Sequence, residues 1–273
     1  MPLIRHLLRI LPARLASSLC YRLFSRNAAA FADYFDDAPL RYAPGQRMRL
    51  NRGDWAHVSI AFMGAYELPV TRLVVESARR HPAGVMVDVG ANFGYFSLLW
   101  AAQHPANRVV AFEPSAANLA ALRGNIDRNG LGPRIRTVAA AVGRQAGVVR
   151  FAQNLEQSGW SRIVTDESPS AAVPMVTLDE QLASEAGHIA LLKIDTEGHD
   201  WEVLAGCIGL LSRRKIARIV FECDASEFHG PLGRQWAATT ERLGLAFRSI
   251  DASAAKDGLM TCLIETPPAG PVS

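Results

Sequence analysis

The chain has 273 residues, of which 49% are hydrophobic and 20% are charged, a composition that excludes an intrinsically disordered protein. Its 29 basic and 26 acidic residues give a net charge of +3, which is too weak to indicate a general nucleic-acid-binding protein. The four cysteines form no CxxC pair, so neither a zinc site nor a disulfide framework is indicated. The cysteines therefore favour a reducing, cytoplasmic location. We also expect no transmembrane helix.

Residues 1–26 combine leucines and isoleucines at roughly helical intervals with five arginines, which predicts a basic amphipathic helix. The arginines interrupt the apolar run too often for a secretory signal peptide. Two interpretations remain. The helix packs on its own domain or on a partner, or it makes a peripheral contact with an anionic membrane such as the inner membrane surface. The first is favoured, because amphipathic helices mostly cover protein cores.

Residues 27–60 contain glycine, proline and aromatic side chains without sustained periodicity, and we expect them to be irregular. From residue 85 onward, short apolar runs alternate with segments of helical spacing, which is the pattern of an α/β fold. The predicted strands lie at 85–89, 108–112, 135–139, 190–194, 218–222, 246–250 and 260–265. The predicted helices lie at 95–103, 116–129, 200–212 and 232–243. We therefore expect a seven-stranded mixed sheet with helices on both faces.

Residues 143–178 interrupt this alternation and predict a β-hairpin insertion. We expect it near the carboxyl edge of the sheet, where open α/β sheets bind ligands. The sequence thus predicts an N-terminal helical or irregular extension over residues 1–80, an α/β domain over residues 81–266, and a tail over residues 267–273.

A glycine turn follows the first predicted strand, in the sequence Val87-Asp-Val-Gly-Ala-Asn-Phe-Gly94. Gly90 can adopt a positive φ, and Gly94 lets the backbone approach a ligand or the sheet. Glu113 ends the next predicted strand, 19 residues after Gly94. A carboxylate at that position can accept hydrogen bonds from both hydroxyls of a ribose. The pattern indicates a cofactor that contains a nucleoside.

Asp88, just before the turn, helps to identify that cofactor. A pyrophosphate binds to backbone N–H groups at a helix N-terminus, so a carboxylate beside it would repel a dinucleotide. S-adenosylmethionine carries an ammonium and a sulfonium, which a carboxylate attracts. The turn also lacks the GxGxxG spacing. We therefore predict S-adenosylmethionine as the cofactor, with an NAD-dependent oxidoreductase as the less favoured alternative.

A second acidic segment follows the predicted strand at 190–194. Asp195 and Glu197 emerge from this strand, and Glu222 ends the neighbouring one. In a parallel sheet these carboxylates lie at the same edge as the glycine turn. Lys193, inside the apolar strand, is expected to pair with Asp195 or Glu222 or to extend from the sheet edge.

Several motifs, in this order, resemble the FkbM family of S-adenosylmethionine-dependent methyltransferases. They are VDVGANFGYFSL from Val87, Phe112-Glu113-Pro114, Asn125 with Asn129 and Gly130, Ala141-Val142-Gly143, Thr177-Leu178-Asp179, and Lys193-Ile194-Asp195-Thr196-Glu197-Gly198. The resemblance spans about residues 84–223. The chain departs from the family at His199, where a small residue is usual, and at Arg144, where an acidic or polar residue is common.

The resemblance implies a class I methyltransferase (Rossmann-like) fold and methylation of a hydroxyl on a sugar, a glycolipid or a secondary metabolite. The predicted donor-binding residues are Asp88, Gly90, Asn92, Gly94, Glu113 and Pro114. The acceptor is expected to be a small molecule or a glycan, not a nucleic acid. The rival interpretation is a non-catalytic protein that binds S-adenosylmethionine for regulation or assembly.

Methylation of a hydroxyl benefits from a base that removes its proton. Position in the sequence favours Asp195 as this catalytic residue, then Glu222, then Glu197. The alternative is a divalent cation bound by Asp195, Glu222 and Asp224.

Several segments are expected to shape the acceptor pocket. The loop Gln157-Ser-Gly-Trp-Ser161 combines hydrogen-bonding groups with an aromatic ring, and is expected to face the acceptor or to form a turn around a buried tryptophan. Residues 27–80, the rest of the insertion, and the segment around Phe228, His229 and Trp236 are the other candidates.

Overall fold

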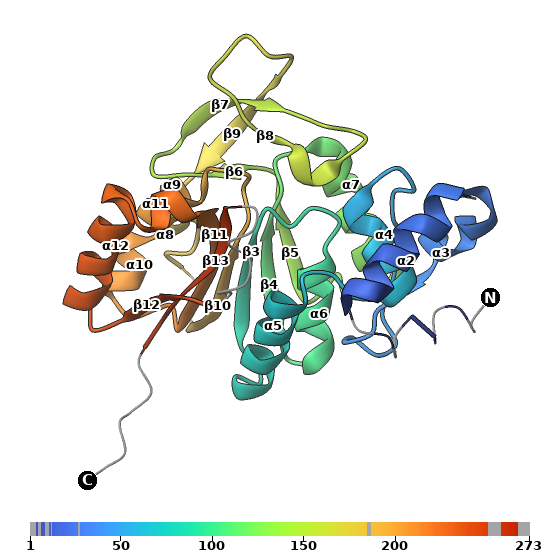
Figure 1. Ribbon diagram of the computed structural model, residues 1–273. Coiled ribbons are helices and arrows are strands. Elements are labelled where there is room, and N and C mark those ends of the chain that lie inside the picture. The colour runs from blue at the N-terminus through green and yellow to red at the C-terminus, as the bar shows by residue number, and fades with distance from the viewer. Residues whose placement is uncertain are drawn as a thin grey trace.

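The computed structural model describes residues 4, 7, 8, 11, 13–26, 28–184, 187–250 and 258–266. A seven-stranded sheet forms its centre, in the order β12-β13-β11-β10-β3-β4-β5 (Figure 1). The strands are β3 (Val85–Val89), β4 (Arg108–Phe112), β5 (Ile135–Val138), β10 (Ile189–Ile194), β11 (Arg218–Asp224), β12 (Ala246–Ser249) and β13 (Leu259–Glu265). β13 runs antiparallel to both of its neighbours, whereas β5, β4, β3, β10 and β11 are mutually parallel. This arrangement confirms the expected class I methyltransferase fold with a mixed sheet.

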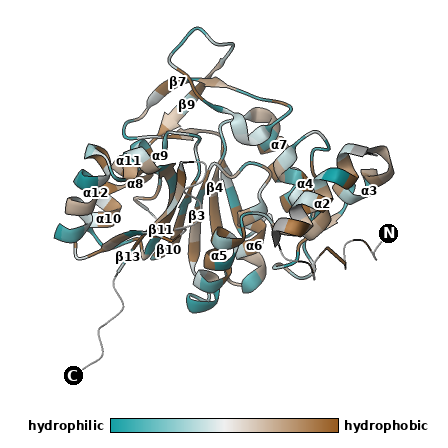
Figure 2. Ribbon diagram, viewed as in Figure 1, coloured by the Kyte–Doolittle hydropathy of each residue, from teal (hydrophilic) through white to brown (hydrophobic). Residues whose placement is uncertain are grey.

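Alternate residues of the central strands enter two different hydrophobic cores. Met86, Val109 and Ala111 belong to one core, while Val87 and Val110 belong to the other. Because successive side chains of a strand point to opposite faces, a sheet that is buried on both faces needs apolar residues at nearly every position. Figure 2 shows the resulting hydrophobic colouring of the central strands.

Helices cover both faces of the sheet. The first core includes residues of α5 (Leu68–Arg80), α6 (Tyr95–Gln103) and α7 (Ala116–Arg128). The second includes residues of α8 (Leu178–Gln181), α9 (Asp200–Ala205), α10 (Ile208–Ser212) and α12 (Pro231–Arg242), and α11 (Ala225–Phe228) follows β11. The predicted single helix over residues 200–212 was wrong, because it is broken between α9 and α10. A Cβ at Gly206, in this break, would collide with the carbonyl group of Gly143, so the close approach of the two chains requires glycine there.

The N-terminal extension packs against the first core. α2 (Ala13–Arg26) buries Ala16 and Cys20, and Tyr21 contacts Trp55 with ring centroids 5.0 Å apart. Residues 27–60 were expected to be irregular, but they contain a 3-10 turn (Ala28–Phe31), α3 (Ala32–Asp36), the short strands β1 (Ala38–Pro39) and β2 (Arg47–Met48), and the start of α4 (Trp55–Met63). These elements are too short to show periodicity in the sequence. The packing of α2 on the rest of the chain supports the favoured interpretation of this helix.

The insertion and the two residues before it form a second, four-stranded sheet in the order β6-β9-β7-β8, above the edge of the central sheet (Figure 1). Its strands are β6 (Ala141–Val142), β7 (Gly147–Ala152), β8 (Arg162–Ile163) and β9 (Ala171–Val176). The antiparallel pair β7 and β9 is the predicted hairpin. A 3-10 turn (Ser158–Trp160) lies between β7 and β8.

Within the described ranges, no single helix is long and apolar enough to span a membrane. Among the described helices, only α4 and α5 taken together have the length and apolar composition of a membrane span, and the two helices are bent by 60° at the break between them. The predicted tail over residues 267–273 lies outside the described residues.

Candidate active site

The glycine turn between β3 and α6 lies directly against the end of β10. Gly90 has a φ of 74°, and a Cβ there would collide with the backbone oxygen of Asp195. Gly94 has a φ of 92°, and a Cβ there would lie 2.5 Å from Cδ1 of Leu122 on α7. Both positions therefore favour glycine, but for different reasons: at Gly90 a side chain would collide with the backbone of Asp195, whereas at Gly94 the positive φ is the reason, because the Leu122 side chain can move.

Glu113, at the end of β4, is fixed beside this turn and is only 4% exposed. Its Oε2 accepts a hydrogen bond from the backbone N–H of Asn92 at 2.8 Å, and its Oε1 accepts one from the N–H of Ser115 at 2.9 Å. Burial raises the pKa of Glu113 to about 7, although these two hydrogen bonds oppose the shift. Each carboxylate oxygen keeps further acceptor capacity for a ligand.

A first cavity lies between the glycine turn and the insertion. Four of the predicted donor-binding residues line it, namely Gly90, Asn92, Glu113 and Pro114. Its other walls include Asn118, Ala140, Ala141, Phe151, Ser158, Asp195 and Glu197. Of these, Asn118 and the Ala140-Ala141 wall were not predicted. A carboxylate, an amide and apolar walls suit the diol and the flat ring of a nucleoside.

Asp88 and Gly94 line neither this cavity nor the one described next. Asp88 is fully buried beneath the turn, where Ser97 Oγ donates to its Oδ2 at 2.6 Å and Lys193 Nζ lies 3.9 Å from its Oδ1. Burial raises the pKa of Asp88, and Lys193 opposes this shift. Asp88 thus lies next to Lys193, outside the lining of both cavities.

A second cavity, of about 720 Å³, adjoins the first. Gly90, Asn92, Gly159, Asp195 and Glu197 line both of them. All three predicted catalytic residues, Asp195, Glu197 and Glu222, line the second cavity together with Glu67 and Tyr66. The segment around Phe228, His229 and Trp236 was expected to shape the acceptor pocket, and Glu227 of this segment lines the second cavity, whereas the three named side chains do not. Trp236 is buried in the second core.

Lys193 is a buried cation among these acids. Its Nζ donates to Asp195 Oδ2 at 3.0 Å and lies 5.0 Å from the centre of the Phe96 ring. The predicted pairing with Asp195 is thus confirmed, and the alternative of an extended side chain at the sheet edge is wrong, because Lys193 is only 3% exposed. Its carboxylate neighbours outweigh the cost of burying this charge.

Three glutamates that line the second cavity have pKa values above the ordinary range of a carboxyl group. Burial, followed by repulsion from Glu67 and Asp195, raises the pKa of Glu222 to about 8. Burial and Asp195 raise the pKa of Glu67 to about 7 and that of Glu197 to about 7. Glu67, at the N-terminus of α5, was missed because it lies in no motif and reaches the site only through the fold.

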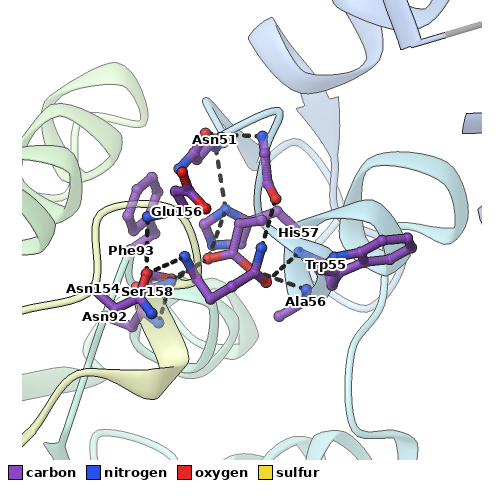
Figure 3. A network of polar contacts seen from close by, with 12 residues as sticks. Asn51, Trp55, Ala56, His57, Asn92, Phe93, Asn154, Glu156 and Ser158 are labelled. Carbon is purple, nitrogen blue, oxygen red and sulfur yellow. Dashed lines mark hydrogen bonds and ion pairs between the residues drawn. The ribbon is translucent and has the colours of Figure 1, made fainter. Parts of the chain in front are cut away.

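A loop of the insertion, residues 154–161, lines part of both cavities. Hydrogen bonds join this loop to the N-terminal extension (Figure 3). Asp54 Oδ2 accepts hydrogen bonds from the backbone N–H of Ser158, at 2.8 Å, and from its hydroxyl. Ser158 Oγ also accepts from Asn92 Nδ2 at 2.9 Å. Asp54 and Ser158 are 1% and 5% exposed. A continuous polar chain therefore joins Asp54, Ser158, Asn92 and Glu113.

The expectation that residues 157–161 face the acceptor agrees with this geometry. Gly159 and Trp160 line the second cavity, and Trp160 is 64% exposed, so it is not the buried tryptophan of the alternative interpretation. Gln157 instead holds the extension: its side chain donates to Gly53 O at 2.8 Å and accepts from the N–H of Trp55 at 3.1 Å.

His199 and Arg144, the two departures from the family pattern, lie outside both cavities. Arg144 pairs with Glu202, with 2.7 Å between Nε and Oε2. Burial lowers the pKa of His199. Neither residue alters the lining of the site.

In the part of the chain that the structure describes, no group of three or more His, Cys, Asp or Glu residues is arranged to hold a metal ion. The predicted alternative of a divalent cation bound by Asp195, Glu222 and Asp224 therefore has no support in the geometry. The Lys193 ammonium lies next to Asp195 instead.

Comparison with known proteins gives a consistent result. The model of the FkbM methyltransferase domain matches residues 88–244. The 31-O-demethyl-FK506 methyltransferase FkbM of Streptomyces tacrolimicus is 44% identical over 70 residues, which are 26% of this chain and 26% of that protein. The AMB antimetabolite synthetase AmbE of Pseudomonas aeruginosa is 28% identical over 196 residues, covering 56% of this chain and 9% of that protein. The matches thus span about a quarter and about a tenth of these relatives.

Solved structures of methyltransferases also align with the chain. A precorrin-6y C5,15-methyltransferase from Geobacter metallireducens has a TM-score of 0.42 at 14% identity, over 71% of this chain and 86% of that chain. TrmK of M. capricolum in complex with S-adenosyl-homocysteine has a TM-score of 0.43 at 12% identity, over 71% and 68% of the two chains.

Proposed function

Because this chain belongs to the family of FkbM methyltransferase domains, and so is an S-adenosylmethionine-dependent methyltransferase, we propose that it methylates a hydroxyl oxygen of a sugar, glycolipid or secondary metabolite. The observation that carries this proposal is the junction of two cavities. The first is lined by Glu113, and the second is lined by carboxylates with raised pKa values, at Glu67 and Glu222.

The residues that line the first cavity suit the nucleoside part of the donor. Glu113 is held by two backbone N–H groups in an orientation that leaves acceptor capacity for two ribose hydroxyls, and Asn118 supplies an amide on the same wall. When bound, S-adenosylmethionine supplies a methyl group on a sulfonium, which is already activated for transfer. The carboxylates of Asp195 and Glu197, where the cavities meet, favour a cation at that point.

The second cavity holds the residues that can accept the proton of the acceptor hydroxyl. Asp195, the first choice from the sequence, is already engaged by the Lys193 ammonium at 3.0 Å. Glu222 and Glu67 have no such partner at that distance in the described structure, and their raised pKa values make them stronger bases near neutral pH. We assign the base to Glu222, with Glu67 beside it, and give Asp195 the role of positioning Lys193 and the glycine turn.

Glu222→Gln separates this enzyme from the rival interpretation, a protein that binds the donor without turnover. The variant should lose about 10² to 10⁴-fold in the rate of methyl transfer. Its dissociation constant for S-adenosyl-homocysteine, measured by calorimetry, should match that of the unmodified chain. Transfer to an extract can be followed by mass spectrometry with isotope-labelled donor. Unchanged transfer by Glu222→Gln would remove Glu222 as the base, and no transfer by the unmodified chain would favour the binding protein.

We propose a cytoplasmic location for the protein. All four cysteines are free and buried, which supports a cytoplasmic location. Leu7, Leu11, Leu15 and Leu19 are 50%, 38%, 61% and 41% exposed on the outer side of the N-terminal segment, which favours a peripheral membrane contact as a second role for residues 1–26. Co-flotation of the chain with anionic liposomes tests this role, and its absence would leave only the packing role.

A further inference from the structure

The second cavity contains many more acidic than basic groups. Among the described residues that line it, seven are acidic: Glu67, Asp195, Glu197, Asp200, Glu222, Asp224 and Glu227. The cations are Lys193 and, when protonated, His57. Burial lowers the pKa of His57, so this side chain is neutral at physiological pH. Lys193 already has two carboxylate neighbours, Asp88 and Asp195.

The donor accounts for only part of this excess. Asp195 and Glu197 line both cavities, where the cationic end of the donor is expected, whereas the other five acids line only the second cavity. Bound S-adenosylmethionine carries one net positive charge. Several carboxylates therefore remain for another cationic group.

Asp200 points to the same conclusion independently of the charge count. Asp200 is 3% exposed. Its Oδ2 accepts two hydrogen bonds from Thr196, one from the hydroxyl at 2.8 Å and one from the backbone N–H at 3.3 Å. Its Oδ1 is buried and accepts no hydrogen bond of normal geometry from the described residues, although the backbone of Glu222 lies close enough to lower the pKa of this carboxyl group. A buried carboxylate oxygen without a donor is costly, and such an atom on a cavity wall indicates a donor that arrives with a ligand.

Aromatic side chains on the cavity walls suit a cation as well. Tyr66, Phe93, Trp160 and Trp201 line the cavity along with the acids. The face of an aromatic ring attracts a nearby cation, and Trp does so most strongly. The cavity already shows one such contact, between Lys193 and the ring of Phe96.

We propose that the second cavity selects an acceptor that carries a protonated amine near the hydroxyl to be methylated, as in an amino sugar or an amino alcohol. This inference rests on the proposed function and narrows its substrate class. Asp200, Asp224 and Glu227, which line the second cavity but not the first, bind the ammonium. Glu222 and Glu67 then remain available for the hydroxyl.

Binding of such a cation is coupled to proton release. A positive charge in the cavity favours the ionised forms of Glu67 and Glu222, whose pKa values of about 7 and about 8 leave them partly protonated at neutral pH. A neutral acceptor causes no comparable release. The enthalpy of binding should therefore depend on the ionisation enthalpy of the buffer for an amine, and not for its neutral counterpart.

The test uses the full chain saturated with S-adenosyl-homocysteine. Glucosamine, 2-deoxystreptamine and serinol are titrated at neutral pH, each against its N-acetylated form, with binding followed by ligand-observed NMR and by calorimetry in two buffers. We expect at least one amine to bind about tenfold or more tightly than its acetylated form, and with proton release. Equal binding of every pair, or preference for the acetylated forms, would overturn the inference.

Matched variants test which carboxylates cause the preference for an amine. Asp224→Asn combined with Glu227→Gln should reduce the preference for the amine several-fold, with an unchanged dissociation constant for S-adenosyl-homocysteine. Glu241→Gln, on the exposed side of α12, is the control for a change of surface charge and should keep the preference. A preference that survives the double variant would contradict the proposed location. If the unmodified chain did not bind S-adenosyl-homocysteine at all, the proposed function itself would be overturned.

Discussion

For some residues of the site, but not for all, the position relative to a predicted strand is enough to place the side chain in the site. Glu113, Asp195 and Glu222 each end a parallel strand or follow it directly, so the rule that strand ends share one edge brings them together. Asp88 also belongs to such a strand end, but its side chain points beneath the turn, toward Ser97. Glu67 has no such rule to place it, because only the packing of α5 on the sheet brings it into the cavity.

The titration of Glu222 and Glu67 predicts a pH dependence. A general base works only after it has lost its proton, so methyl transfer should become faster as pH rises through the pKa values of about 7 for Glu67 and about 8 for Glu222. Single-turnover rates measured from about pH 6 to about pH 9 should therefore rise and then level off. In Glu222→Gln the upper part of this rise should disappear. A flat profile for the unmodified chain would contradict the assignment of either carboxylate as base.

Among the elements, the insertion shows that strands of two residues cannot be predicted from sequence periodicity. The β7 and β9 hairpin has enough alternating residues to be predicted, whereas β6 and β8 have two residues each and show no periodicity. The hydrogen bonds from residues 154–161 to residues 51–57 join positions about a hundred apart in the sequence. Such contacts follow from the tertiary fold, and no local pattern predicts them.

The contact between Asp54 and Ser158 should control how firmly this loop covers the donor. Asp54→Asn keeps the oxygen that caps α4 but replaces the acceptor of the two Ser158 hydrogen bonds. Loss of hydrogen bonds to a charged group costs about 1.5 to 3 kcal/mol, so S-adenosyl-homocysteine should bind roughly tenfold or more weakly. Proteolysis within residues 154–161 should also become faster.

Asp166→Asn is a matched control, because Asp166 lies on an exposed turn of the same insertion and lines neither cavity. It should leave both the affinity and the proteolysis rate unchanged. If Asp54→Asn behaved like this control, the loop would not depend on the Asp54 contact.

At the scale of the whole molecule, the sheet and its two layers of helices follow from the alternation in the sequence. The domain boundary near residue 80 remains a prediction. Leu8, Cys20, Phe35 and Phe62 of the extension share one hydrophobic core with Leu99 and Leu122 of the α/β domain. The extension also supplies Glu67, Tyr66 and His57 to the second cavity. Sequence periodicity cannot show this shared core, because it reports local structure and not the surface on which an element packs.

The central claim is that the donor binds in the cavity lined by Glu113. Calorimetric titration of the unmodified chain and of Glu113→Ala with S-adenosylmethionine tests it most directly. Removal of the acceptor for two ribose hydroxyls should cost about 1 to 3 kcal/mol, which weakens binding about 5- to 150-fold. Circular dichroism should show the same fold in both proteins. Equal dissociation constants for the two proteins, or no binding by the unmodified chain, would contradict the account.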